Sequence, residues 1–375
     1  MAGLYIHIPF CKSRCIYCAF YSTVDSPWKQ RYVEAVCREM TLRSQGPTRP
    51  QIETVYLGGG TPSQLSMEQL ERLFQHIRQT YDVAATAEVT MEMNPDDVTR
   101  EYAEALVQMG VNRVSMGVQT FHEQRLQFLH RRHTAAQIPQ AVNTLRTAGI
   151  SNISIDLMYG FPEETLSDWQ HDIDEALALD VEHISAYCLM IEEGTPLYKQ
   201  LHKRDGSFCV VCDEELERTM YEMLIDRLTA AGYEHYEISN FAQQGRRSRH
   251  NSNYWHDVPY TGLGAAAHSY DGCCRSWNVA DIHQYIEAIE RGELPSEQEA
   301  IDDDTHYNDR ITTALRTSDG LNLTTLTEHH RRHCMKEARR FVDDGLLRLT
   351  DDQRLVLTRK GLFVSDYVMS ELMMV

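Results

Sequence analysis

The segment YIHIPFCKSRCIYCAFYS, residues 5–22, places three cysteines within eight positions. Cys11, Cys15 and Cys18 follow a short apolar run, with three and then two residues between them. A chain of 375 residues can bury a core without disulfide staples, so clustered thiols favour metal or redox chemistry over a disulfide framework. The apolar run before them, residues 4–8, is also the first strand of the pattern that determines the fold.

After this strand, short apolar runs alternate with helical patterns about six times in the first ~240 residues. Helices are predicted over 66–81 and 99–110, because Ser66 and Gln69 have the spacing of a capping box and Gly110 is a typical C′ glycine. Alternating strands and helices predict a parallel sheet with crossover helices, and their regular spacing favours a barrel or part of one. The predicted strands are 4–8, 54–59, 88–93, 113–118, 153–160 and 183–190.

The remaining chain divides into two parts. Residues 239–277 are rich in Gly, Asn, Ser and aromatic residues without clear periodicity, which is typical of a long functional loop. The sequence pattern of about the last hundred residues predicts helices, then a hairpin that turns near Asp351 and Asp352, and then a final helix. We therefore expect a barrel domain over 1–240, a connecting loop region over 241–277, and a smaller, mostly helical, winged-helix-like domain over 278–375.

Composition limits the function. The formal net charge of −19 argues against a large nucleic-acid surface, which needs clustered Lys and Arg. The start MAGLYIHIPF has no positively charged region, and His7 and Pro9 interrupt its apolar run, so it is not typical of a signal peptide. No run of about 18 apolar residues predicts a membrane helix. We expect a cytoplasmic protein.

Two metal sites compete for the three thiols. Structural zinc needs four ligands, and no second cysteine pair stands at zinc-ribbon spacing. The distant pair Cys209 and Cys212 is interpreted as ordinary thiols. An iron–sulfur cluster also usually takes four thiolates, but three on a four-iron cluster would leave one iron open to bind substrate or cofactor.

The CxxxCxxC spacing resembles the signature of the radical S-adenosylmethionine (SAM) enzymes, whose open iron chelates the amino and carboxylate groups of SAM. The resemblance implies a partial (β/α)6 TIM-type barrel and a reduced [4Fe–4S] cluster that cleaves SAM to a 5′-deoxyadenosyl radical. The stretch GGGTP, residues 58–62, follows the second predicted strand, where glycines let backbone approach a ligand.

A narrower resemblance covers nearly the whole chain. In order, YIHIPFC, GGGTP, MEMNP, RVSMGVQTF, IDLMYGFP and GAAAHS are similar to the HemN-like family of coproporphyrinogen dehydrogenases. Carboxylates and amides at strand ends supply acceptors for ribose hydroxyls and an ammonium, and an arginine can pair a carboxylate. The resemblance implies SAM contacts at Tyr5, Tyr17, Gly59, Gly60, Thr61, Glu92, Gln119, Arg131 and Asp156.

Two departures separate the chain from the oxygen-independent coproporphyrinogen III oxidase of that family. The oxidase carries a further cysteine two positions after the third cluster ligand, where this chain has Phe20. The oxidase also has a long N-terminal extension, and here the first strand begins almost at once. Both departures resemble the haem chaperone branch, HemW, as does HNSNYW, residues 250–255.

This motif permits two interpretations. His250 could ligate haem iron, with Tyr254 and Trp255 stacking on the porphyrin, or the motif could be a loop anchored by buried aromatics. His268 is a second candidate haem ligand, in an AAAHS stretch that departs from the usual GPGAHS of the branch.

The preferred hypothesis is a haem chaperone that binds the cluster, SAM and haem and passes haem to apo-haemoproteins, including respiratory membrane complexes. The alternative is the coproporphyrinogen oxidase; a DNA-binding role of the C-terminal module is disfavoured by charge. The chaperone hypothesis implies an electron donor such as flavodoxin or ferredoxin and no nucleic acid, and leaves a homodimer open.

Overall fold

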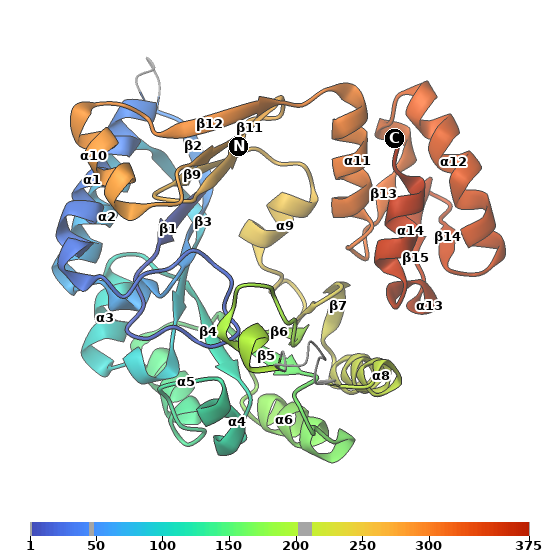
Figure 1. Ribbon diagram of the computed structural model, residues 1–375, viewed down its shortest axis with the longest axis horizontal. Coiled ribbons are helices and arrows are strands. Elements are labelled where there is room, and N and C mark those ends of the chain that lie inside the picture. The colour runs from blue at the N-terminus through green and yellow to red at the C-terminus, as the bar shows by residue number, and fades with distance from the viewer. Residues whose placement is uncertain (1, 45–48, 202–211, 375) are drawn as a thin grey trace.

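The structure is a computed structural model and describes residues 2–44, 49–201 and 212–374. Its centre is a run of six parallel strands in the order β1 to β6, so neighbours in sequence are neighbours in the sheet (Figure 1). All six predicted strands are present. Their bounds are β1 Ala2–Ile8, β2 Gln51–Gly59, β3 Asp82–Met93, β4 Arg113–Gln119, β5 Ile153–Tyr159 and β6 His183–Cys188.

Helices cover the outer face of this sheet and leave the carboxyl ends of the strands free for loops (Figure 1). The Ser66–Gln69 capping box forms as predicted, and Gly110 has the positive φ of a C′ glycine. The barrel helices are α1 Lys29–Arg43, α2 Met67–Thr80, α3 Arg100–Gln108, α4 Glu123–Phe128, α5 Gln137–Ala148, α6 Leu166–Ala178, α7 Pro196–Leu201 and α8 Glu214–Ala230. Short 3-10 turns lie at η1 Ser26–Trp28, η2 Pro62–Gln64 and η3 Pro95–Asp97.

The sheet extends beyond these six strands on both sides, to twelve strands in all. Strands β8 and β7 continue it antiparallel from β6, and β9 pairs parallel with β1 before β10, β11 and β12 follow antiparallel. In the described residues the edge strands β7 and β12 do not pair with each other, so the barrel is partial. The added strands are β7 Glu234–Glu237, β8 Asn240–Ala242, β9 Tyr260–Leu263, β10 His268–Tyr270, β11 Cys274–Asn278 and β12 Ser296–Ala300.

The segment 241–277 is therefore not the connecting loop region expected from its composition. It holds helix α9, Arg249–Trp255, together with strands β9 and β10 and most of β11. The following helix α10, Ile282–Arg291, packs on α1. Strands β9, β10 and β11 have three to five residues each and are too short to show a clear alternation, but their hydrogen bonds make them part of the sheet that begins with β1.

A separate set of elements follows residue 302, with its own buried core and a three-stranded antiparallel sheet in the order β13, β15, β14. The predicted hairpin is formed by β14 and β15, which agrees with a smaller, largely helical, winged-helix-like unit (Figure 1). No helix in the described ranges is both long and apolar enough to cross a membrane. The elements are α11 Asp303–Ala314, β13 Leu321–Asn322, η4 Leu323–Thr325, α12 Glu328–Asp343, β14 Leu347–Leu349, β15 Arg354–Leu357, α13 Arg359–Leu362 and α14 Ser365–Leu372.

Candidate functional site

The three N-terminal cysteines lie in the loop that follows β1, at the carboxyl end of the parallel strands. Each is half-buried. The Cys11 thiol accepts a hydrogen bond from Thr61 Oγ1 at 3.6 Å, and the Cys15 thiol lies 3.3 Å from Nη1 of Arg131. All three line one cavity of about 200 Å³. The three cysteines that are close in the sequence therefore also line the same cavity in the structure.

The cysteine loop has little regular structure and is fixed by contacts at both ends. Backbone bonds between Cys11 and Thr23 (2.8 Å) and between Thr23 and Pro9 (2.7 Å) close its base. In its middle, Ile16 is buried in an apolar cluster with Leu129, Met158, Phe161, Leu189 and Leu197. The loop is thus held by elements that follow β4, β5 and β6.

The glycine-rich turn after β2 forms the next part of the wall. Gly59 has φ of 111°, and a Cβ there would lie 2.4 Å from the His7 ring. A Cβ on Gly60 would lie 2.7 Å from the Pro9 carbonyl carbon. Only glycine permits this close approach to the base of the cysteine loop. The Gly59 amide donates to Glu92 at 3.0 Å, which joins β2 to β3 at the cavity.

Strands β4 and β5 bring further polar groups to the cavity. Gln119 ends β4 with φ of 72°, and its amide lies over Gly117. Arg131 donates to Asn94 Oδ1 and to the Gly117 carbonyl, both at 2.6 Å. Its Nε is buried without a hydrogen-bond partner among the described residues. Because an unpaired buried donor is costly, Arg131 Nε is ready to bind an acceptor on a ligand.

Two carboxyl groups in the cavity have perturbed acidities. Burial raises the pKa of Glu92 to about 7, opposed by hydrogen bonds from Tyr56 Oη (2.8 Å) and the Gly59 amide. Burial raises the pKa of Asp156 to about 6, opposed by the charge of Arg113 and by hydroxyl groups including that of Ser115. Both groups are partly protonated near neutral pH, so a cationic ligand would favour their ionised forms.

The cavity brings together every predicted cofactor residue of the barrel except Tyr5: Cys11, Cys15, Tyr17, Cys18, Gly59, Gly60, Thr61, Glu92, Gln119, Arg131 and Asp156. Tyr5 instead lies inside the barrel, stacked on Tyr56 and hydrogen-bonded to His7 Nδ1 at 3.0 Å. Asn94, in the MEMNP stretch, was not predicted as a site residue. Asn94 lines the cavity and orients Arg131, a role that becomes visible only when β3 and the segment after α4 are adjacent.

The donor set fits an iron–sulfur cluster better than a single metal ion. Among the described residues no three Cys, His, Asp or Glu side chains converge as ligands of one ion. Each thiolate of a four-iron cluster binds a different iron, so these thiolates need not converge on one point. Three cysteine thiols on one wall, with an arginine beside Cys15 to balance thiolate charge, suit a cluster with one open iron.

The HNSNYW stretch forms helix α9 and lies inside the molecule away from the cysteines. His250 is 1% exposed, and its Nδ1 and Nε2 are hydrogen-bonded to Thr54 Oγ1 and Tyr254 Oη, both at 2.8 Å. Burial lowers the pKa of His250 to about 3. The Glu88 carboxylate accepts from the backbone amides of Arg249 and His250 at the start of the helix. With both ring nitrogens engaged, this geometry does not favour His250 as a haem ligand.

The other haem candidates line two further cavities. His268 begins β10, is exposed, and forms one wall of a groove of about 720 Å³ with Trp277, whose ring centroid is 6.1 Å away. No hydrogen-bond partner of the His268 ring occurs in the described part of the chain. Tyr254 and Trp255 line a different cavity, of about 410 Å³, between α9 and α11. The structure therefore places His268, predicted as the second candidate ligand, in a different cavity from Tyr254 and Trp255.

The other cysteines of the described residues do not line this cavity. Cys188 ends β6 and lies beside Glu217, and Cys212 is half-buried nearby. Cys209, predicted with Cys212 to be an ordinary thiol, lies outside the described residues.

Comparisons with known proteins agree with this geometry. Residues 5–176 match the Radical SAM superfamily. The chain is 36% identical over 335 residues to the heme chaperone HemW of Bacillus subtilis, covering 88% of each protein. It is 34% identical over 376 residues to HemW of Mycobacterium tuberculosis, covering 99% of this chain and 94% of that protein. The solved coproporphyrinogen III oxidase HemN of Escherichia coli superposes with a TM-score of 0.85 at 22% identity, covering 99% of this chain and 89% of HemN. This last likeness shows a shared fold.

Proposed function

The chain belongs to the HemW family of the radical SAM superfamily, and we propose that it is a haem chaperone. It would hold a [4Fe–4S] cluster and SAM, bind haem, and pass haem to apo-haemoproteins. The observation that carries the proposal is the shared cavity, in which the three cysteines face Glu92 and Arg131.

In this function the cavity is the cofactor site. Cys11, Cys15 and Cys18 would hold the cluster through their thiolates, which would leave one iron open for SAM. When bound, the cluster and SAM supply one-electron chemistry at the sulfonium. Arg131, whose Nε has no partner among the described residues, would pair with the carboxylate of SAM. Glu92 would accept from its ammonium and ribose hydroxyls, and Gly60 lets the turn after β2 approach the base of the cysteine loop.

We assign haem to the groove beside His268. Of the two candidate histidines, only His268 offers an imidazole without a protein partner, and neutral imidazole is a common iron ligand. Trp277 on the same wall supplies an aromatic face for a porphyrin.

The groove has the properties of a carrier site rather than a permanent haem pocket. It is open, and His268 is exposed. The lining carries three carboxylates, of Glu287, Glu293 and Glu297, and one arginine, Arg291, which pairs with Glu293. The excess negative charge repels haem propionates and directs them toward solvent. A single ligand and an unfavourable charge limit affinity, which permits release to an acceptor protein. Respiratory membrane haemoproteins as recipients, a flavodoxin or ferredoxin as reductant, and a homodimer are further parts of the proposal.

One pair of assays tests the function. Anaerobically reconstituted protein is titrated with haemin, and the haem-loaded protein is mixed with an apo-haemoprotein. In parallel, the same preparation receives coproporphyrinogen III, SAM and dithionite. We expect a haem spectrum, transfer to the acceptor and no protoporphyrinogen. Protoporphyrinogen formation would establish the oxidase alternative, and a preparation that binds no haem would refute the chaperone.

A further inference from the structure

A strained backbone position lies at the edge of the cofactor cavity. Gln119 ends β4 in the left-handed region, with φ of 72°, which glycine adopts freely and a glutamine adopts only when its surroundings require it. The strand register shifts between Gly117 and Gln119 at the same point. This geometry places the side-chain amide of Gln119 over Gly117, and Gln119 lines the cavity. Some contact on the following residues must hold this conformation.

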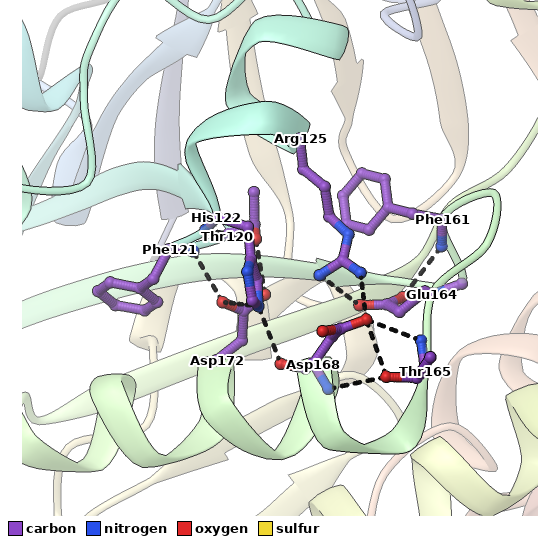
Figure 2. Close-up of polar contacts among 10 residues, drawn as sticks. Thr120, Phe121, His122, Arg125, Phe161, Glu164, Thr165, Asp168 and Asp172 are labelled. Atoms are coloured by element: carbon purple, nitrogen blue, oxygen red, sulfur yellow. Dashed lines mark hydrogen bonds and ion pairs between the residues drawn. The ribbon is translucent and has the colours of Figure 1, made fainter.

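That contact is Asp172, on the second turn of α6 (Figure 2). Its carboxylate is fully buried and accepts from Thr120 Oγ1 at 2.7 Å and from the Phe121 amide at 2.8 Å. Thr120 and Phe121 directly follow Gln119. The nearest ring nitrogen, His122 Nε2, is 3.8 Å away, so the two donors from this loop are the close partners of Asp172. A buried carboxylate requires such donors, and here both come from the segment that must stay strained.

A second set of contacts joins the same loop to α6. Arg125 on α4 donates to Asp168 at 2.9 Å and lies 3.5 Å from Glu164, with its guanidinium over the Phe161 ring (Figure 2). Glu164 accepts from the amides of Gly160 and Phe161 at 2.6 and 3.0 Å. These contacts fix the helix that leads to Arg131. The residues after Gln119 are held to α6 by Asp172, through Thr120 and Phe121, and by the Asp168 carbonyl, which lies 3.2 Å from His122 Nε2.

We propose that Asp172 is a positioning residue for SAM: its bonds to Thr120 and Phe121 hold Gln119 in the left-handed conformation that faces the cavity. This inference rests on the proposed function, because it takes the cavity to be the SAM site. Asp172 does not touch the cavity itself. Its removal should weaken SAM binding without changing the iron content or the haem affinity.

The test compares three variants in the anaerobically reconstituted full-length protein. Asp172→Ala removes both acceptors, and Asp172→Asn restores an acceptor for the Phe121 amide. Thr120→Val removes one hydroxyl donor with almost no change in volume, and it carries the test if Asp172→Ala does not fold. Thr165→Ala is the matched control, because it removes the N-cap bond of the same helix, from the Asp168 amide to Thr165 Oγ1, and leaves both hydrogen bonds of Asp172 in place.

We expect the Kd for SAM to rise about tenfold in Asp172→Ala and about threefold in Thr120→Val, with partial recovery in Asp172→Asn. Hydrogen exchange of the backbone around residues 119–122 should accelerate in the first two variants and not in Thr165→Ala. Faster exchange with unchanged SAM affinity would overturn the inference and leave Asp172 a structural residue. If the unaltered protein binds no SAM, the proposed cofactor site itself is refuted.

Discussion

Protonation of Glu92 is predicted to weaken SAM binding as the pH falls through 7. Burial raises the pKa of this carboxyl from 4.5 to about 7, although Tyr56 and the Gly59 amide both donate to it. SAM carries an ammonium and a sulfonium, so the carboxylate form binds it more tightly than the neutral acid. Because its pKa is about 7, the Glu92 carboxyl becomes mostly neutral below pH 7. The affinity for SAM must therefore fall as the pH drops below 7.

The size of the effect follows from the titration. With a pKa of about 7, about nine-tenths of Glu92 is ionised at pH 8 and about one-tenth at pH 6, so the affinity should fall about tenfold between them. Asp156, with a pKa of about 6, lines the same cavity and should steepen the loss below pH 6.

The assay is equilibrium dialysis of SAM against reconstituted protein from pH 6 to 8. Glu92→Gln should bind SAM about tenfold more weakly at pH 8 and show a flat profile down to about pH 6.5. Glu104→Gln, which removes one exposed carboxylate that pairs with Arg100 on α3, is the control and should keep the wild-type profile. A wild-type affinity that does not change with pH, or a Glu92→Gln profile like that of the wild type, would refute the reasoning.

Three further predictions concern the other parts of the site. His268→Ala should lower haem affinity at least about tenfold in a haemin titration while leaving SAM affinity unchanged, and full haem affinity would contradict the groove assignment. His250→Ala should leave haem affinity unchanged and lower the free energy of unfolding by about 2–4 kcal/mol in urea, because it removes a buried ring with two hydrogen bonds. Gly60→Ala should reduce the iron content after reconstitution, because its Cβ would lie 2.7 Å from the Pro9 carbonyl carbon and displace the cysteine loop. Full iron content in this variant would show that the turn does not support that loop.

The parallel core of the fold was predictable because its strands are largely buried and are short runs rich in apolar residues, separated by helical patterns. The outer strands were not. Strand β12, Ser296–Ala300, is exposed at every residue and has the sequence SEQEA, whose charged residues suit a sheet edge and look like a loop in sequence. Strands β8 and β10 have three residues each, too few to show alternation. Their pairing depends on contacts with β6 and β9 that no local pattern contains.

The site was predictable to a similar depth. The cysteines could be identified from spacing alone, since three thiols in eight residues have few other uses. The conformation of Gln119 could not be predicted from the sequence. We infer that it depends on the carboxylate of Asp172 on α6, which is bonded to the Phe121 amide across 51 positions of sequence. In the sequence Asp172 looks like any other acidic residue on a helix. Its burial distinguishes it, and that burial arises only when α6 packs against the sheet.

The HNSNYW stretch shows why residue types alone could not assign haem. An imidazole, a phenol and an indole are suited both to binding a porphyrin and to filling a polar gap between layers. The number of free ring nitrogens distinguishes these uses. His250 has none, because Tyr254 occupies one of them and Thr54, 196 positions away in the sequence, occupies the other. Its motif instead fastens α9 to β2 and β3, and so places Trp255 under the guanidinium of Arg316, 5.3 Å from the ring, just after α11. In this protein the motif therefore helps to join the barrel to the C-terminal unit, and the search for the haem ligand moves to the one candidate histidine whose ring faces solvent.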